Sequence, residues 1–142
     1  MATGSVDVAT VVPSIFTVPG GNVAAAVAVR VAADGTQTPL AVFQCGTAGS
    51  CSATPIDMGG ATDSVFLTLF GTGLRKNSGL ANVRASIGGA TVAVVFAGAQ
   101  GEFAGLDQVN LQLPASLRGR GDVSIGLTVD GQTSNSVTVN VR

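Results

Sequence analysis

Few side chains in this sequence have types and spacings suited to chemistry, and the two cysteines form the clearest pair. Cys45 and Cys51 enclose the small residues GTAGS and follow the strand-like stretch LAVFQ. Residues this small let the chain fold back into a disulfide, which would stabilise the loop by about 2 kcal/mol and indicates an oxidising compartment. The alternative is a pair of unlinked small apolar side chains. A zinc site is disfavoured, because the sequence has no histidine and no third thiol.

Four carboxylates are the next candidates: Asp57, Asp63, Glu102 and Asp107. Paired carboxylates hydrolyse glycosidic bonds, and clustered carboxylates bind calcium. No spacing in the sequence sets two of them face to face, and no Asp-x-Asp-x-Asp run concentrates oxygen ligands. A serine or cysteine nucleophile would also lack a histidine base. We therefore expect no catalytic residue, no metal and no cofactor, which makes the chain a non-enzymatic protein.

Asp107 and Phe103 are the two candidate ligand-binding residues. Asp107 begins the stretch LDQVNLQLP, where apolar residues alternate with amides as in a half-buried strand. Its carboxylate could accept backbone N–H groups of the preceding glycine-rich loop, so a structural role is the main interpretation. The alternative is a calcium ligand together with Asp57 and Asp63. Phe103, in the loop GEFAG, is the aromatic side chain that a bound sugar would need.

Two short motifs resemble known recognition sequences. The tripeptide RGD at 120–122 matches an integrin ligand, but it leads directly into Val123 of an expected strand, so we interpret it as a polar turn. The stretch LFGTGLRKNSGL is glycine-rich and basic, yet it lacks both the spacing and the helix of a phosphate-binding loop. We interpret its residues 75–77 as a solvated loop tip.

Strands, not helices, must position these side chains, because apolar residues recur at every second position between regular turn signals. Three dipeptides predict hairpin turns: Asp34-Gly35, Gly88-Gly89 and Asp130-Gly131. The run SVFLTLF is apolar on both faces, which predicts a central strand. The hairpin at 83–96 is expected to point six side chains into the core: Val83, Ala85, Ile87, Val92, Val94 and Phe96. No segment combines helical periodicity with caps, so we expect nearly no helix.

Length and composition are those of one all-β domain. The chain has 142 residues, of which only 11% are charged and 4% aromatic. Nine or ten short antiparallel strands would each bury one face in an immunoglobulin-like β-sandwich. We expect a single domain over 1–142, in which an N-terminal extension (1–60) with the disulfide hairpin packs on a core at 61–142.

Charge and hydropathy narrow the class of partner. Seven basic and eight acidic residues are scattered along the chain, so nucleic acid and anionic lipid surfaces are disfavoured as ligands. The longest apolar run, 23–29, falls far short of the ~20 residues that a membrane helix needs. We therefore expect no membrane insertion.

Several stretches resemble a known family. VVPSIFTV, PIDMG, TDSVFLTLFGTGLR, VRASIGG and LTVDGQTSNSVTVNVR resemble, in order and through nearly the whole chain, the Solibacter-type uncharacterised C-terminal domain of large secreted acidobacterial proteins. Within them, the order GTGL, IGG, VNLQLP and VDGQTSN is similar to the immunoglobulin-like IPT/TIG domains. The resemblance implies an extracellular or cell-surface module, and it carries over no catalytic residue.

Together these observations predict a non-catalytic C-terminal module of a secreted or cell-surface bacterial protein, with a structural, spacer or adhesion role. Its partners would be other domains of a parent protein or surface polymers. One alternative is a carbohydrate-binding module of an extracellular enzyme; against it, the chain has no Trp or Tyr, and most of its phenylalanines fall at positions that predict burial. The other is a surface-fibre subunit, a homo-oligomer in which SVDVATVV pairs with a neighbour's edge strand.

Overall fold

The computed structural model describes residues 12–142, and strands make up most of its regular structure. The strands are β1 (Ser14–Ile15), β2 (Ala26–Val31), β3 (Gln37–Ala41), β4 (Phe43–Cys45), β5 (Cys51–Ala53), β6 (Ser64–Thr72), β7 (Val83–Ile87), β8 (Ala90–Ala99), β9 (Asp107–Leu113), β10 (Gly121–Val129), β11 (Gln132–Thr133) and β12 (Val137–Val141). Two short 3₁₀ turns, η1 (Leu80–Asn82) and η2 (Ala115–Leu117), complete them. The prediction of an all-β fold is confirmed, with more strands than the nine or ten expected. Within 12–142, no helix is long and apolar enough to cross a membrane.

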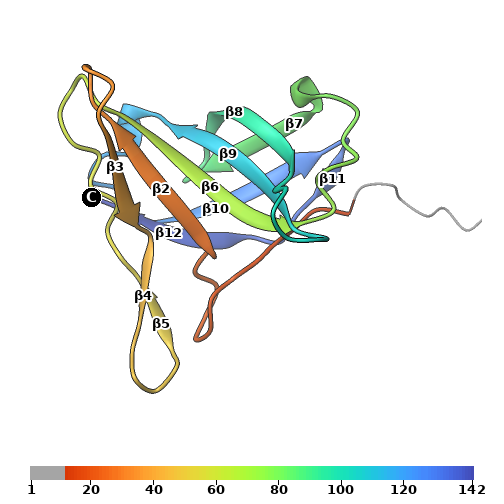
Figure 1. Ribbon diagram of the computed structural model, residues 1–142, viewed down its shortest axis with the longest axis horizontal. Coiled ribbons are helices and arrows are strands. Elements are labelled where there is room, and N and C mark those ends of the chain that lie inside the picture. The colour runs from red at the N-terminus through yellow and green to blue at the C-terminus, as the bar shows by residue number, and fades with distance from the viewer. Residues whose placement is uncertain (1–11) are drawn as a thin grey trace, which may run out of the picture.

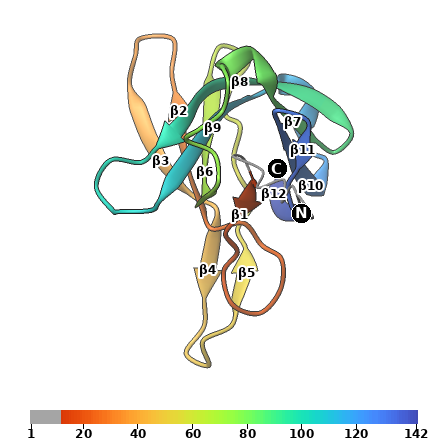
Figure 2. The same cartoon turned by 90° about the vertical axis from the view of Figure 1, so that its right-hand side faces the viewer.

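Ten of the strands form one antiparallel sheet that folds over into two layers. The order is β11-β10-β7-β8-β9-β6-β2-β3, with β1 beside β6 and β12 beside β10. β8 belongs to both layers, because residues 90–92 pair with β7 and residues 93–99 pair with β9. Figure 2 shows β2, β6 and β9 on one side and β7, β10 and β12 on the other. We call these the β6 layer and the β10 layer.

The core lies between the two layers and is made of aliphatic side chains. On β6 the burial alternates strictly, so that Val65, Leu67 and Leu69 face inward. Their partners across the sheet are the buried residues Leu113, Leu111 and Val109 of β9. Each such side chain contributes about 2 kcal/mol through removal from water. β6 lies between β2 and β9, which confirms the prediction of a central strand.

The three predicted hairpin turns are present, but one strand changes phase. Asp34-Gly35 joins β2 to β3, Gly88-Gly89 joins β7 to β8, and Asp130-Gly131 joins β10 to β11. After β11, β12 pairs with the earlier part of β10. A bulge at Val95 inserts one extra residue between the pairs Val94↔Leu111 and Phe96↔Asn110. Because side chains alternate between the faces of a sheet, the extra residue turns Phe96 outward, where it is 41% exposed. The expectation that Phe96 points into the core is therefore wrong.

The edges of the sheet differ in how they are covered. Residues 22–24 and Ile56 hydrogen-bond to the outer side of β12. β3 pairs with β2 alone among the described residues, and it is largely exposed and carries Pro39, which has no N–H to donate. The stretch SVDVATVV, expected to pair with a neighbour, lies outside the described residues except for Val12.

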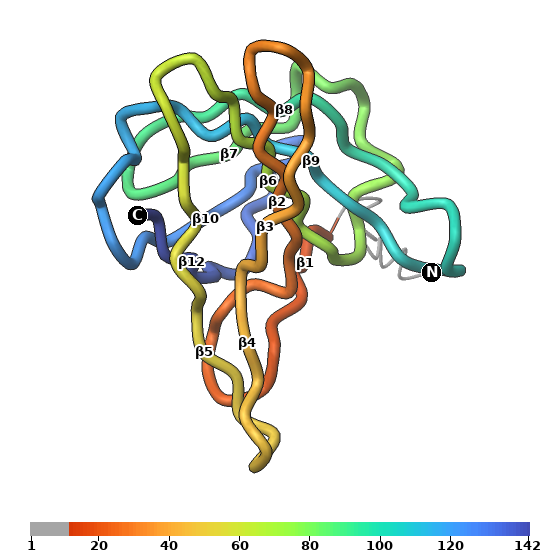
Figure 3. Tube along the Cα trace, turned by 60° about the vertical axis from the view of Figure 1, so that its left-hand side comes forward, coloured from red at the N-terminus to blue at the C-terminus, as the bar shows by residue number. Residues whose placement is uncertain are grey.

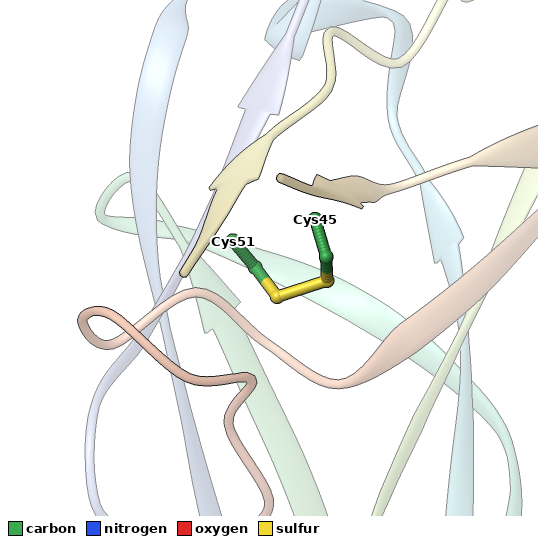
Figure 4. Close-up of a disulfide and its surroundings, with 2 residues drawn as sticks. All are labelled: Cys45 and Cys51. Carbon is green, nitrogen blue, oxygen red and sulfur yellow. A yellow bond between two sulfur atoms is a disulfide. The ribbon is translucent and has the colours of Figure 1, made fainter. Parts of the chain in front are cut away.

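Strands β4 and β5 form a hairpin that projects away from the two layers (Figures 1 and 3). We call residues 43–53 the disulfide arm. Cys45 and Cys51 lie directly opposite each other in its register and are joined by a disulfide (Figure 4), which confirms that prediction. The N–H of Cys51 also donates to the carbonyl of Pro19, at 2.8 Å, so the arm is tied at its base to the loop before β2.

Removal of the disulfide is expected to loosen the arm and leave the layers folded. In the double variant Cys45→Ser/Cys51→Ser, opening of the arm should become easier by about 2 kcal/mol, because the bond closes only a short loop. Hydrogen exchange followed by mass spectrometry would measure this as faster exchange of amides in 43–53, with β6 and β9 unchanged. Equal acceleration in β6 would contradict a local role.

Candidate functional site

Asp107 is the one buried charged residue among those described, at 2% exposure, and its partners identify its role. The antiparallel pairing of β6 with β9 places it opposite Gly71, beside the loop that follows β6. Its carboxylate accepts the N–H of Leu74 at 2.8 Å, the N–H of Arg75 at 3.1 Å and the Nε of Arg75 at 2.6 Å. The expectation that it binds the glycine-rich loop preceding β9 is therefore wrong, because it fastens the loop after β6 instead.

Residues 75–77 form a loop tip in which Arg75 and Lys76 are exposed, as expected from the sequence, but two of its side chains also fasten the loop. Arg75 folds back onto Asp107 and also donates from Nη2 to the carbonyl of Leu106 at 3.2 Å. The Nδ2 of Asn77 donates to the carbonyls of Leu74 and Ala97, so this side chain ties the loop to β8. With both oxygens of Asp107 occupied by protein donors, the geometry favours the structural interpretation of that residue.

The three carboxylates of the calcium hypothesis do not meet. Asp57 and Asp63 flank Arg30, with N–O distances of 3.6 and 3.8 Å. Asp63 lies just before the first residue of β6, whereas Asp107 pairs near its last. The N–H of Gly59, assisted by the charge of Arg30, holds the pKa of the exposed Asp57 below its ordinary value. Within 12–142, no cluster of three acidic, cysteine or histidine side chains is suited to a metal.

The RGD tripeptide is part of the sheet. β10 begins at Gly121, and Asp122 pairs with Asn140 of β12, whose Nδ2 donates to the Asp122 carboxylate at 2.8 Å. The Nη2 of Arg120 donates to the carbonyl of Gly88 at 3.1 Å. A tripeptide held by two neighbouring segments does not protrude as an integrin ligand must, which favours the interpretation as a polar strand start.

None of the phenylalanines lies fully inside the core, although Phe43 packs against it. All six are among the described residues, and none is fully buried: Phe16, Phe96 and Phe103 are 40%, 41% and 64% exposed, and the other three are half-buried. The prediction that most of them are buried is wrong. Both faces of β6 carry apolar side chains. Its aliphatic residues point into the core, so Phe66 and Phe70 point outward.

Four phenylalanines gather on the outer face of the β6 layer. The pairing register places Phe66 opposite Gln112, Phe70 opposite Gln108, and Phe96 opposite Asn110. Phe16 continues the β1 register next to Phe70, to whose carbonyl it donates at 2.8 Å. We call this surface the phenylalanine–amide face; its members are Phe16, Val27, Val29, Phe66, Thr68, Phe70, Phe96, Gln108, Asn110 and Gln112. Figure 1 shows its strands β2, β6, β9 and β8 side by side.

Polar groups run along the middle of this face, on β9. The Oδ1 of Asn110 accepts from the Oγ1 of Thr68 at 2.9 Å and from the Nε2 of Gln108 at 3.1 Å. These bonds fix the orientation of the Asn110 amide, and Gln112 beside it is exposed. At the outward positions of β2, β6, β9 and β8, no residue is charged.

Sequence reasoning missed this face, although the sequence contains a pattern that predicts it. The amides of LDQVNLQLP mark the outward phase of β9, and pairing with β6 then makes the phenylalanines of SVFLTLF outward as well. Elsewhere, residues of η1, β7, β8 and β10 line a hollow of about 550 Å³, in which small side chains such as Ser86, Thr91 and Gly126 predominate.

Comparison of the chain with protein-family models, with curated proteins and with solved structures finds no match.

Proposed function

We propose that this chain is a non-catalytic, immunoglobulin-like module of a secreted or cell-surface protein, with an adhesion role. The observation that carries the proposal is the disulfide between Cys45 and Cys51 in an all-β sandwich. Such bonds persist in oxidising compartments and are rare in reducing ones. Three of the four candidate carboxylates pair with an arginine: Asp57 and Asp63 with Arg30, and Asp107 with Arg75, while Glu102 lies exposed in the loop between β8 and β9. Carboxylates paired with arginine inside the fold support a role that does not involve catalysis.

The exposed apolar surface supports adhesion over a purely spacing role. Monomeric soluble proteins rarely expose a large contiguous apolar patch unless that patch binds a partner. Here Phe16, Val27 and Phe96 are each at least 40% exposed on one sheet face. A spacer has no use for such a face, whereas a module that attaches to a surface polymer or to another domain does.

Labelling of intact cells would test the extracellular placement. Lys76 is the sole lysine of the sequence, and it is exposed. An amine-reactive reagent that cannot cross membranes should modify Lys76 in living cells that produce the protein, and leave a cytoplasmic protein of the same cells unlabelled. Alkylation without a reductant should find no free thiol. Labelling only after lysis, together with two alkylated cysteines, would overturn the proposal.

A further inference from the structure

We propose that the phenylalanine–amide face binds an uncharged polysaccharide chain. This inference rests on the proposed adhesion role and names the ligand class for it. The site is the outer surface of the β6 layer and does not involve the loop that holds Phe103. It therefore differs from the sugar site that the sequence suggests.

The absence of charge on the face selects the class of ligand. None of the outward positions on β2, β6, β9 and β8 within the described chain bears a charged side chain. Anionic polymers are recognised by arginine and lysine, and a charged partner laid on this face would lose its hydration without a counter-charge. An uncharged ligand meets no such penalty.

The mixture of side chains indicates a partner that is itself both apolar and polar. Aromatic rings offer flat apolar surfaces to the C–H faces of sugar rings, while amides donate to and accept from hydroxyls. Phe66 and Phe70 lie on one side of the β9 amides, and Phe96 lies on the other. The tip of the Phe96 ring leans over Gly98, where a Cβ would meet ring atoms at 3.3 Å, so this ring lies along the sheet and does not stand upright on it.

The Asn110 network leaves hydrogen-bonding capacity for a ligand. Its Oδ1 accepts two bonds from Thr68 and Gln108, so the amide orientation is set in advance. Its Nδ2, and both ends of the exposed Gln112 amide, have no partner among the side-chain hydrogen bonds of residues 12–142. A preset donor beside a free amide lowers the entropy cost of binding a hydroxylated chain.

The spacing of the aromatic side chains favours a polymer over a single sugar. Phe66 and Phe96 stand on strands separated by β9 and are offset by one outward position along the strands. Strand spacing and residue rise place their Cα atoms roughly 12 Å apart. This separation is longer than one pyranose ring, whereas several linked rings can lie across β6, β9 and β8.

Binding assays on the 142-residue chain would test the inference. The probes are soluble xylan, mixed-linkage β-glucan and galactomannan in affinity electrophoresis and calorimetry, and cellulose and chitin in pull-down assays. The wild-type protein should bind at least one of them, with an affinity that is the same at low and high salt because no ion pair forms. Phe96→Ala should bind that probe about tenfold more weakly, which corresponds to ~1.4 kcal/mol.

Phe103→Ala is the matched control, because it removes an exposed phenylalanine from outside the face. It should bind as the wild type does, and both variants should keep the wild-type urea midpoint. Three results would overturn the inference: no binding to any of the five neutral probes, binding only to anionic polygalacturonate, or an equal loss in Phe103→Ala. Sedimentation that shows a dimer dissociated by Phe96→Ala would also overturn it, because a second copy would then cover the face. None of these results bears on the labelling of Lys76, so the two proposals fail separately.

Discussion

Replacement of Asp107 by alanine is expected to lower the free energy of unfolding by about 3 kcal/mol. The side chain is buried at the start of β9 and accepts three hydrogen bonds from Leu74 and Arg75. Its removal leaves the buried N–H of Leu74 without an acceptor and the Arg75 guanidinium without its counter-charge. Urea denaturation followed by circular dichroism would measure the loss as a lower midpoint at an unchanged slope.

Two controls separate this role from a general effect of removing a carboxylate. Asp122→Ala removes an exposed carboxylate that accepts one bond from Asn140, and should change stability by less than about 0.5 kcal/mol. Arg75→Ala should cost about 1 kcal/mol, because that side chain is 41% exposed and the backbone bonds to Asp107 remain. If Asp107→Ala were no more destabilising than Asp122→Ala, the fastening role of Asp107 would be refuted.

A methyl group added at Gly71 is expected to destabilise the protein by about 3 kcal/mol. Gly71 is the second-last residue of β6 and pairs with Ile15 of β1. A Cβ at this position would overlap the carbonyl oxygen of Ser14. Backbone cannot move aside as a side-chain tip can, so Gly71→Ala must push β1 away and draw the buried Ile15 from the core. Hydrogen exchange at Phe16, whose N–H donates to Phe70, should become faster.

Gly126→Ala is the matched control, since Gly126 is also a strand glycine. The nearest atom to its added methyl is the Oγ of Ser86, at 3.9 Å, which is ordinary contact. This variant should be as stable as the wild type or slightly more so, because alanine loses less backbone entropy on folding. Equal urea midpoints for Gly71→Ala and Gly126→Ala would show that β1 does not press on β6.

The elements of the fold could be predicted because local patterns determine them. Period-two alternation and the dipeptides at 34–35, 88–89 and 130–131 depend only on neighbouring residues, and the structure places strands and turns there. The bulge at Val95 could not be predicted in this way, because its origin is the register between β8 and β9. A single extra residue reversed the direction of Phe96 and, with it, the interpretation of the aromatic side chains.

The candidate site depended on pairings between distant segments. The burial of Asp107 was not visible in its own stretch, since its partners Leu74 and Arg75 come from a loop more than thirty residues earlier. The outward phase of Phe66 and Phe70 became clear only when β6 was paired with β9. The disulfide was predictable because its two cysteines are close in sequence and the residues between them are small.

The placement of β12 determines how the molecule would carry a mechanical load. The first described residues and the C-terminus lie at opposite ends of the long axis, and β12 runs toward the C-terminal end (Figure 1). A pull on Arg142 therefore acts along the strand, and the bonds to β10, to residues 22–24 and to Ile56 are strained together in shear. Bonds loaded in this way do not open one after another, as they do when a hairpin is unzipped. The sandwich should therefore resist stretching up to a sharp rupture force, and then lose β12 in a single step.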